Sequence, residues 1–229
     1  MTLNTFITRS LLLSTIALSG LLGYLIFSIF IMTTMSDPIE TLQHQPEYTH
    51  IHTLPQHVRD AFIVAEDNYF ETHHGVDYSA LYRAGKILLL TGKKQQGGST
   101  ITMQLARNLY LSKEKTFWRK IREIHYAYLL EHRFSKSDII SLYLNKIYFG
   151  HGCYGIKQAS QYYFGTHPQT LSVAQAATLA SLPVAPAKIT PLLTPNVVLK
   201  KRNLILRRMF ALRMITPSTL ENALQQPLI

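Results

Sequence analysis

The most constraining feature of the sequence is a run of 27 residues near its start, residues 10–36, without a charged side chain. As a helix this run would span about 40 Å, more than the roughly 30 Å hydrocarbon core of a membrane. A cleaved signal peptide has a shorter apolar region, about 7–15 residues, followed by a small-residue cleavage site. Residues 32–36 offer no such site, so we predict a retained transmembrane anchor over residues 10–36.

The charges on either side of this run indicate its orientation. Arg9 and the α-amino group lie on the near side, whereas Asp37 and Glu40 follow on the far side, with no lysine or arginine before Arg59. Positive charge is retained on the cytoplasmic side of membrane helices. We therefore expect residues 1–9 in the cytoplasm and the rest of the chain outside it.

Composition narrows the class of protein behind the anchor. The chain has 23 lysines and arginines against 13 aspartates and glutamates, a net charge of +10, yet it is 47% hydrophobic and only 16% charged. A disordered polyelectrolyte is excluded by that hydrophobicity, and an internal disulfide is excluded because Cys153 is the only cysteine. The positive excess indicates an anionic partner: nucleic acid, anionic lipid or a phosphorylated substrate.

The remaining residues divide into a linker and one helical domain. Residues 37–54 are polar and proline-containing, and we interpret them as a linker with little regular structure; its histidines, His50 and His52, more readily suit a solvated segment than a metal site. Residues 55–229 have helical spacing and repeated caps. These caps are Ser135, Ser172 with Gln175, Thr194 before Pro195, and Thr216 before Pro217.

Two segments near the start of the helical domain contain candidate catalytic or binding residues. Glu66 directly follows the apolar residues 61–65, so its carboxyl is expected to be partly desolvated, which raises the pKa and favours a general base. Taken alone, an acidic loop or a structural salt bridge is the more common explanation. In the second segment Gly97 and Gly98 permit close backbone approach, and Ser99 or Thr100 can cap the following helix.

Two later segments contain a charged helix face and a stretch typical of the core. Arg119, Lys120 and Glu123 lie three or four residues apart on one helix face, either as an ordinary surface ion pair or as a carboxylate held beside phosphate-binding cations. Residues 136–165 are typical of core packing and turns. Within them we single out Asn145 as a residue that orients a neighbour.

In this order the segments resemble the family 51 peptidoglycan glycosyltransferases, which include monofunctional transglycosylases and the glycosyltransferase domains of class A penicillin-binding proteins. The pattern Glu-Asp-x-x-Phe-x-x-His-x-Gly matches residues 66–75, and Gly-Gly-Ser-Thr-x-Thr-x-Gln matches residues 97–104. Arg-Lys-x-x-Glu matches residues 119–123, and Tyr-Leu-Asn-x-x-Tyr-x-Gly matches residues 143–150. The resemblance covers about residues 55–228.

The resemblance implies a predominantly α-helical, lysozyme-like glycosyltransferase domain over residues 55–229, with a small membrane-interfacial lobe, behind one transmembrane helix. It implies polymerisation of lipid II into β-1,4-linked glycan, with inversion at the donor carbon and release of undecaprenyl pyrophosphate. The expected location is the bacterial cytoplasmic (inner) membrane, with the catalytic domain periplasmic or otherwise extracytoplasmic. Expected partners are lipid II, the growing strand, the membrane and other cell-wall synthesis and division proteins, but no nucleic acid.

By similarity Glu66 is the general base and Glu123 acts on the pyrophosphate side, where magnesium or manganese is an optional rather than obligatory cofactor. Residues expected to bind sugar or phosphate are Arg83, Ser99, Gln104, Arg107, Lys115, Arg119 and Lys120. Supporting residues are Asp67, Phe70, His73, Gly75, Gly97, Gly98, Thr100, Asn108 and Asn145. The chain departs from the family where Met103 replaces a glutamine, Arg107 a lysine and Lys115 an arginine.

Two alternatives remain at this point: a lytic transglycosylase or muramidase that cleaves glycan, and an inactive anchored scaffold of wall synthesis.

A segment with Lys86, four apolar residues, Lys93 and Lys94 indicates a part that dips into the membrane interface. Ser112 and Lys115 have no Lys-Thr-Gly partner, so we expect no transpeptidase and a monofunctional protein.

Overall fold

A computed structural model describes residues 3–34, 38–92, 97–112 and 116–229. The described parts are helical, and their only strand-like pairing is an isolated antiparallel bridge between Tyr148 and Tyr154. The prediction of a predominantly α-helical chain is confirmed. The elements are α1 (Leu3–Thr34), α2 (Pro38–Gln43), η1 (Ile51–Thr53), α3 (Gln56–Glu66), α4 (Tyr78–Thr91), α5 (Ile101–Tyr110), α6 (Phe117–Arg133), α7 (Lys136–Lys146), α8 (Ile156–Phe164), η2 (Pro168–Thr170), α9 (Val173–Ala180), α10 (Pro195–Ala211) and α11 (Pro217–Gln225).

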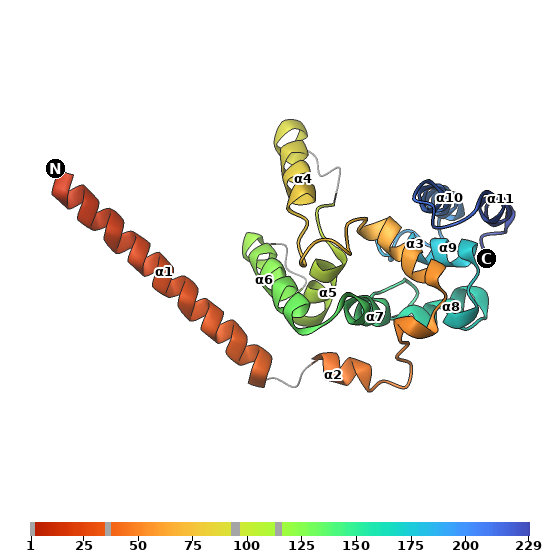
Figure 1. Cartoon of the computed structure of the whole chain (residues 1–229), viewed down its shortest axis with the longest axis horizontal. Coiled ribbons are helices and arrows are strands. Elements are labelled where there is room, and N and C mark those ends of the chain that lie inside the picture. The colour runs from red at the N-terminus through yellow and green to blue at the C-terminus, as the bar shows by residue number, and fades with distance from the viewer. Residues whose placement is uncertain (1–2, 35–37, 93–96, 113–115) are drawn as a thin grey trace. The chain divides into compact units, whose positions relative to one another are not determined.

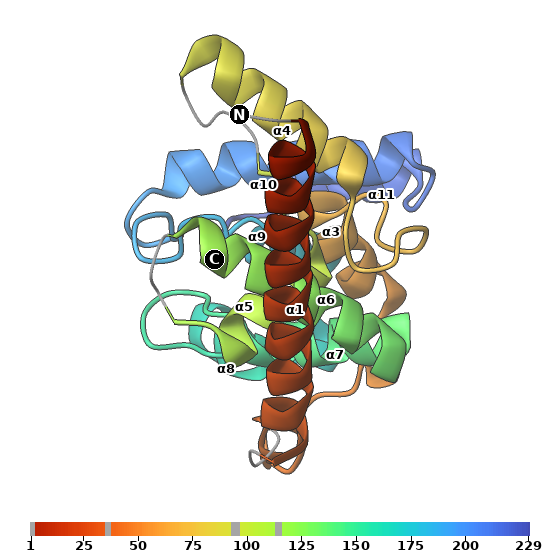
Figure 2. The same ribbon diagram turned by 90° about the vertical axis from the view of Figure 1, so that its left-hand side faces the viewer.

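The chain forms two compact units, residues 1–41 and residues 42–229. The first contains α1, whose 32 residues form one uninterrupted helix (Figures 1 and 2). Its segment Leu11–Phe30 has a mean hydropathy of 2.0, and it is the one helix in the described parts that is long and apolar enough to cross a membrane. The predicted long apolar helix is therefore present and fits a membrane anchor.

The second unit is built around α3, α5, α7, α9 and α10. Helix α3 packs against α9 and α10, and α5 packs against both α6 and α7. The buried face of α3 includes Val58 and Phe62, and the Phe62 ring meets the Phe149 ring edge to face at 6.0 Å between centroids. This packing places the last residue of α3, Glu66, beside α5 and α7.

The predicted caps are largely confirmed. Ser135 and Ser172 both form reciprocal capping boxes, with Asp138 and Gln175 respectively. The Thr216 side chain accepts from the backbone of Thr219 at the start of α11. Thr194 is the exception, because its side chain makes no capping hydrogen bond at the start of α10.

The predicted linker differs most from the structure. Residues 38–43 form α2 and residues 51–53 form a short 3₁₀ helix, and the second compact unit begins at Leu42 rather than at residue 55. The amide side chain of Asn145 in α7 binds both the backbone N–H and the C=O of Thr49, at 2.8 Å each. Polar composition suggested a solvated segment, but a distant buried amide satisfies the backbone N–H and C=O of Thr49 within it.

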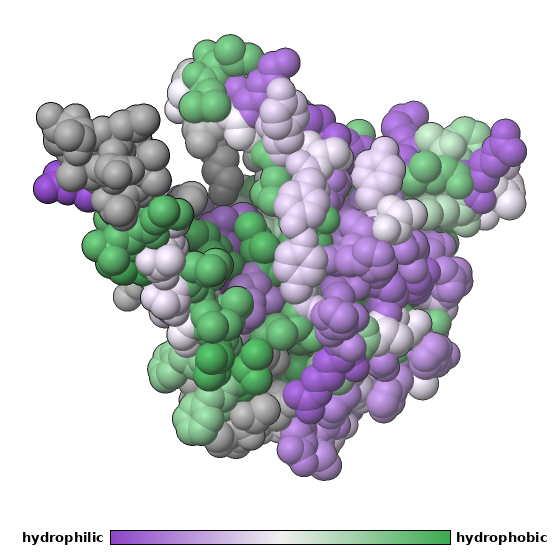
Figure 3. Space-filling model, turned by 60° about the vertical axis from the view of Figure 1, so that its left-hand side comes forward, coloured by the Kyte–Doolittle hydropathy of each residue, from purple (hydrophilic) through white to green (hydrophobic). Residues whose placement is uncertain are grey.

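Helix α4 stands apart from the other helices of its unit (Figures 1 and 2). Near its end the side chains of Leu89 and Leu90 are 87% and 74% exposed, and apolar residues gather at this end in the space-filling view (Figure 3). Exposed leucines on a protruding helix agree with the predicted membrane-interfacial lobe. Lys93 and Lys94 lie outside the described residues.

Candidate active site

Glu66 ends α3, where the helix backbone stops and the chain turns toward α4. Its Oε2 accepts a hydrogen bond of 2.7 Å from Nε2 of Gln104 in α5. Its Oε1 is buried and has no hydrogen-bond partner within the described parts of the chain. Burial raises the pKa of the Glu66 carboxyl, which Gln104, Lys201 and Arg107 only partly offset. The prediction of a desolvated carboxyl with a raised pKa is thus confirmed.

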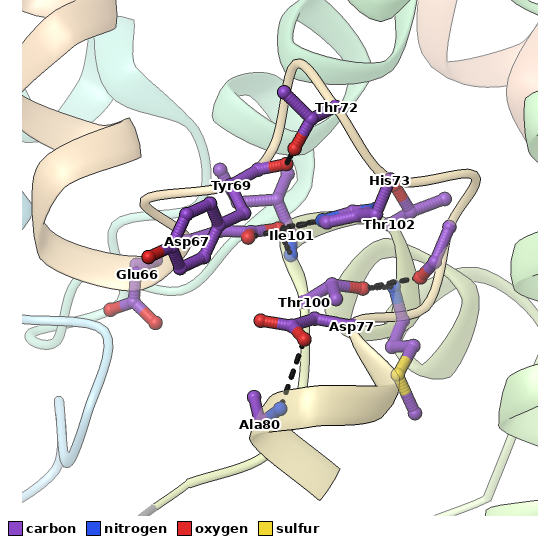
Figure 4. Close-up of polar contacts among 12 residues, drawn as sticks. Glu66, Asp67, Tyr69, Thr72, His73, Asp77, Ala80, Thr100, Ile101 and Thr102 are labelled. Carbon is purple, nitrogen blue, oxygen red and sulfur yellow. Dashed lines mark hydrogen bonds and ion pairs between the residues drawn. The ribbon is translucent and has the colours of Figure 1, made fainter.

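Asp67 is the neighbour of Glu66 but points elsewhere (Figure 4). Its Oδ2 accepts from the backbone N–H of Ile101 at 3.0 Å and lies 2.9 Å from Nε2 of His73. The backbone C=O of His73 in turn accepts from Nζ of Lys136 at 2.6 Å. These contacts join the loop after α3, directly beside Glu66, to the first residue of α5.

Three more supporting residues stabilise the same loop. Phe70 is fully buried, with Nζ of Lys136 4.6 Å from its ring centre. The Thr100 hydroxyl donates to the C=O of Gly75 at 2.6 Å and caps α5 by accepting from Met103. Gly75 has φ +85°, and a Cβ there would lie 3.0 Å from the backbone oxygen of Ala127. A side chain at position 75 would therefore be strained by both conformation and space.

The second carboxylate, Glu123 in α6, is only 1% exposed and bound on both oxygens. Its Oε2 accepts from Nη1 of Arg119 at 2.8 Å, and its Oε1 accepts from Nζ of Lys120 at 2.9 Å and from the Ser99 hydroxyl at 3.2 Å. Nζ of Lys120 also donates to Ser99 at 2.8 Å. Burial lowers the pKa of Lys120, and Glu123 partly restores it. The cluster is therefore a buried ion network rather than a surface pair.

Arg107 in α5 acts electrostatically on both carboxylate regions. Its charge helps to hold down the otherwise burial-raised pKa of Glu66, and it adds to the burial-driven lowering of the pKa of Lys120. Arg83 in α4 donates to the Ser79 hydroxyl at 3.0 Å and lies 4.0 Å from the Asp77 carboxylate.

A cavity of about 320 Å³ opens beside Glu66. Its walls come from the loop after α3, from α4, from residues 97–100 and from α10. Ser99 therefore faces the cavity while its hydroxyl contacts the Glu123 cluster. The lining residues are Val64, Ala65, Glu66, Asp67, Asn68, Tyr69, Asp77, Ala80, Arg83, Gly97, Gly98, Ser99, Thr100 and Arg208.

Sequence analysis did not assign two cations of α10 to this site. Arg208 lines the cavity, and the charge of Lys201 stabilises the Glu66 carboxylate. The only sequence signal was the basic character of residues 186–229, which does not separate these two from Arg202. Arg202 is fully buried and binds the carbonyls of Leu224 and Gln226, so its role is to hold the C-terminal segment.

Several predicted residues have other surroundings. Asn145 binds Thr49 and Ser141, so it orients a neighbour as expected, although that neighbour is not a catalytic group. Asn108 is exposed, and Gly97 has open space around its Cα. Met103 is fully buried beside Val76 and Ala127, so the position that departs from the family is a core position. Lys115 lies outside the described residues.

The surroundings of Glu123 do not fit a resident divalent cation. Both of its oxygens already accept from Arg119, Lys120 and Ser99, and the positive charges of Arg119 and Lys120 would repel such an ion. The described parts of the chain also contain no group of three histidine, cysteine, aspartate or glutamate side chains placed to hold a metal.

Comparison with known proteins shows the family to which the chain belongs. Residues 35–210 match the family model Transglycosylase. A Cupriavidus necator protein that is named as a transglycosylase is 40% identical over 192 residues, which cover 84% of this chain and 83% of that protein. Penicillin-binding protein 1A of Aquifex aeolicus is 47% identical over 181 residues, covering 79% of this chain. Penicillin-binding protein 1A of Escherichia coli is 44% identical over 156 residues, covering 68%. The chain spans only 25% and 18% of these two longer relatives. The chain belongs to the transglycosylase family.

Proposed function

We propose that the protein is a membrane-anchored peptidoglycan glycosyltransferase that polymerises lipid II into β-1,4-linked glycan and releases undecaprenyl pyrophosphate. The observation that carries the proposal is the state of Glu66: one oxygen is held by Gln104, and the other is buried without a partner beside a cavity. A carboxylate with a raised pKa and a free lone pair is suited to accept a proton.

In the proposed reaction Glu66 Oε1 takes the proton of the 4-hydroxyl of the incoming lipid II. The hydroxyl oxygen attacks the anomeric carbon of the growing strand from the face opposite the pyrophosphate. The bond from that carbon to the pyrophosphate oxygen breaks, and the electron pair leaves with the lipid pyrophosphate. A single displacement of this kind converts an α-linked donor into a β-linked product.

The leaving pyrophosphate needs positive charge rather than a general acid. Arg119 and Lys120 are held by the buried Glu123, and Arg107 adds a third charge between the two carboxylate regions. Donors that are fixed before the reaction stabilise developing charge without reorganising. We assign Glu123 the task of holding these cations in place.

The remaining parts of the proposal concern location. Helix α1 would anchor the chain in the bacterial cytoplasmic membrane with its N-terminus inside, and the exposed Leu89 and Leu90 of α4 would enter the interface on the outer side. Both substrates carry lipid tails, so a catalytic domain held at the bilayer surface meets them there. Other wall-synthesis and division proteins are proposed as partners.

The test supplies the detergent-solubilised full-length protein with lipid II and, separately, with polymerised glycan. We expect a lipid-linked polymer and free undecaprenyl pyrophosphate from lipid II, and no products from glycan. Products from glycan alone would establish the lytic alternative, and no turnover of either would favour the scaffold.

A further inference from the structure

Tyr143 of α7 lies directly behind the pair formed by Glu66 and Gln104. It is fully buried, and its hydroxyl donates a long hydrogen bond of 3.4 Å to Oε1 of Gln104. The Gln104 Nε2 donates in turn to Oε2 of Glu66 at 2.7 Å. Catalytic hydrogen bonds are often long without substrate and shorten when it binds.

The direction of this hydrogen-bond chain is determined by the groups at its two ends, the Tyr143 phenol and the Glu66 carboxylate. Burial, together with the negative charge of Glu66, holds the pKa of Tyr143 well above its ordinary value, so the phenol keeps its proton and donates. The ionised Glu66 carboxylate only accepts hydrogen bonds, so the NH₂ of Gln104 must face it, which turns the Gln104 oxygen toward the Tyr143 hydroxyl. The flipped amide would place its oxygen against the carboxylate, lose the hydrogen bond to Oε2 and leave the phenol proton facing an NH₂ group.

We propose that Tyr143 is a positioning residue that orients the Gln104 amide, so that Glu66 is held through Oε2 and keeps Oε1 free to accept a proton. The inference rests on the proposed role of Glu66 as the general base. Tyr143 itself does not touch the substrate in this proposal. It acts on the carboxylate through Gln104.

Other charged groups also act electrostatically on the Glu66 carboxyl, and replacement of Tyr143 leaves them in place. They are Arg107 on α5, Lys201 on α10 and the adjacent Asp67. Tyr163 on α8 offers a matched control, because it is also buried and donates its hydroxyl to the C=O of Phe149 at 2.8 Å. Tyr163→Phe removes one buried hydrogen bond that does not lead to Glu66.

The experiment compares wild type, Tyr143→Phe and Tyr163→Phe as full-length proteins. One measurement follows the Glu66 side-chain carboxyl by carbon-13 NMR across pH, and the other follows kcat/KM for lipid II. In Tyr143→Phe the weaker hold on Gln104 should raise the pKa of Glu66 and move the acid limb upward by about half a pH unit. Turnover on the acid limb should fall by up to about three-fold, the factor that half a pH unit gives, with little change on the plateau above it. Tyr163→Phe should lower Tm and move neither titration.

An unchanged Glu66 titration in folded Tyr143→Phe would overturn the proposal. A shifted titration with an unshifted acid limb would instead overturn the assignment of Glu66 as the base, and with it any role for Tyr143 in the reaction. In a Gln104→Leu background, Tyr143→Phe should cause no further shift. If Tyr143→Phe does not fold, 3-fluorotyrosine at position 143 keeps the ring packing and strengthens the donor, so the Glu66 pKa should fall; a rise or no change would contradict the proposal.

Discussion

Glu66 and Glu123 are the same residue type in one site, yet their surroundings differ sharply. Glu66 has one amide donor on Oε2 and none on Oε1 within the described residues. Glu123 is buried with a cation on each oxygen and a hydroxyl besides. A carboxylate with a free lone pair can take up a proton, whereas one bound by cations serves to fix their positions. The surroundings of each carboxylate, rather than its residue type, therefore determine which of the two proposed roles it is suited to.

The largest effect should come from Glu66→Gln. The amide cannot accept the hydroxyl proton, so kcat for lipid II should fall by roughly 10²–10⁴-fold, the usual contribution of a general base. Circular dichroism and Tm should show a folded protein. A variant that polymerises lipid II at the wild-type rate would remove the distinction between the two carboxylates.

Lys120→Met tests the cation cluster around Glu123. It removes a half-buried charge that contacts both Glu123 and Ser99, so lipid II turnover should fall by about 10²-fold, as expected for the loss of one preorganised donor. The control is Arg122→Met on the same helix, since Arg122 lacks an ion pair with Glu123 in the structure. Equal losses in the two variants would show a general charge effect on α6 rather than a specific site.

These two carboxylates were within reach of sequence analysis because each lies in a recognisable local pattern. Glu66 follows an apolar helix, and Glu123 is spaced for pairing with Arg119 and Lys120. The caps at Ser135, Ser172 and Thr216 were predictable for the same reason, since capping depends on three or four consecutive residues. Local patterns therefore predicted the helical character of the domain and singled out the two segments, and the family resemblance supplied the roles expected of their carboxylates.

The remaining features depend on contacts between distant residues. Lys201 and Arg208 reach the site only because α10 packs on α3 and α9. The basic character of residues 186–229 does not reveal which of its cations face the site. Residues 42–54 looked like a linker because the amide that binds Thr49 lies 96 residues later, at Asn145. Met103 stands where the family has a glutamine, and only the packing shows that this position is in the core.

Lys201→Met tests the electrostatic environment of the Glu66 carboxyl. The charge of Lys201 stabilises the carboxylate, so its removal should raise the pKa of Glu66 further. Because the base is active only when ionised, the acid limb of kcat/KM should move to higher pH, with a few-fold loss of kcat/KM on that limb and little change on the plateau above it. Lys200→Met, at the exposed neighbouring position, should leave the limb in place. A shift in both variants would indicate a bulk electrostatic effect.

The smallest effect should come from Thr216→Ala, away from both carboxylates. Loss of the cap on α11 should cost about 1 kcal/mol and lower Tm by roughly 2–4 °C. Thr194→Ala, at the other Thr-Pro helix start, should lower Tm less because its hydroxyl caps nothing there. Neither variant should alter the pH profile. A changed limb in either would mean that the site is not electrostatically separate from the C-terminal helices.

The most direct test of the division of roles is the pH profile of kcat/KM for lipid II in wild type and Glu123→Gln. Glu123 raises the pKa of Lys120 against the effect of burial, so its removal should lower that pKa. Lys120 is a cation only below its pKa, and the alkaline limb should therefore move to lower pH. We predict this shift with an unchanged acid limb, which reports Glu66. A profile in which Glu123→Gln moves the acid limb and leaves the alkaline limb in place would contradict the assignment of the two carboxylates.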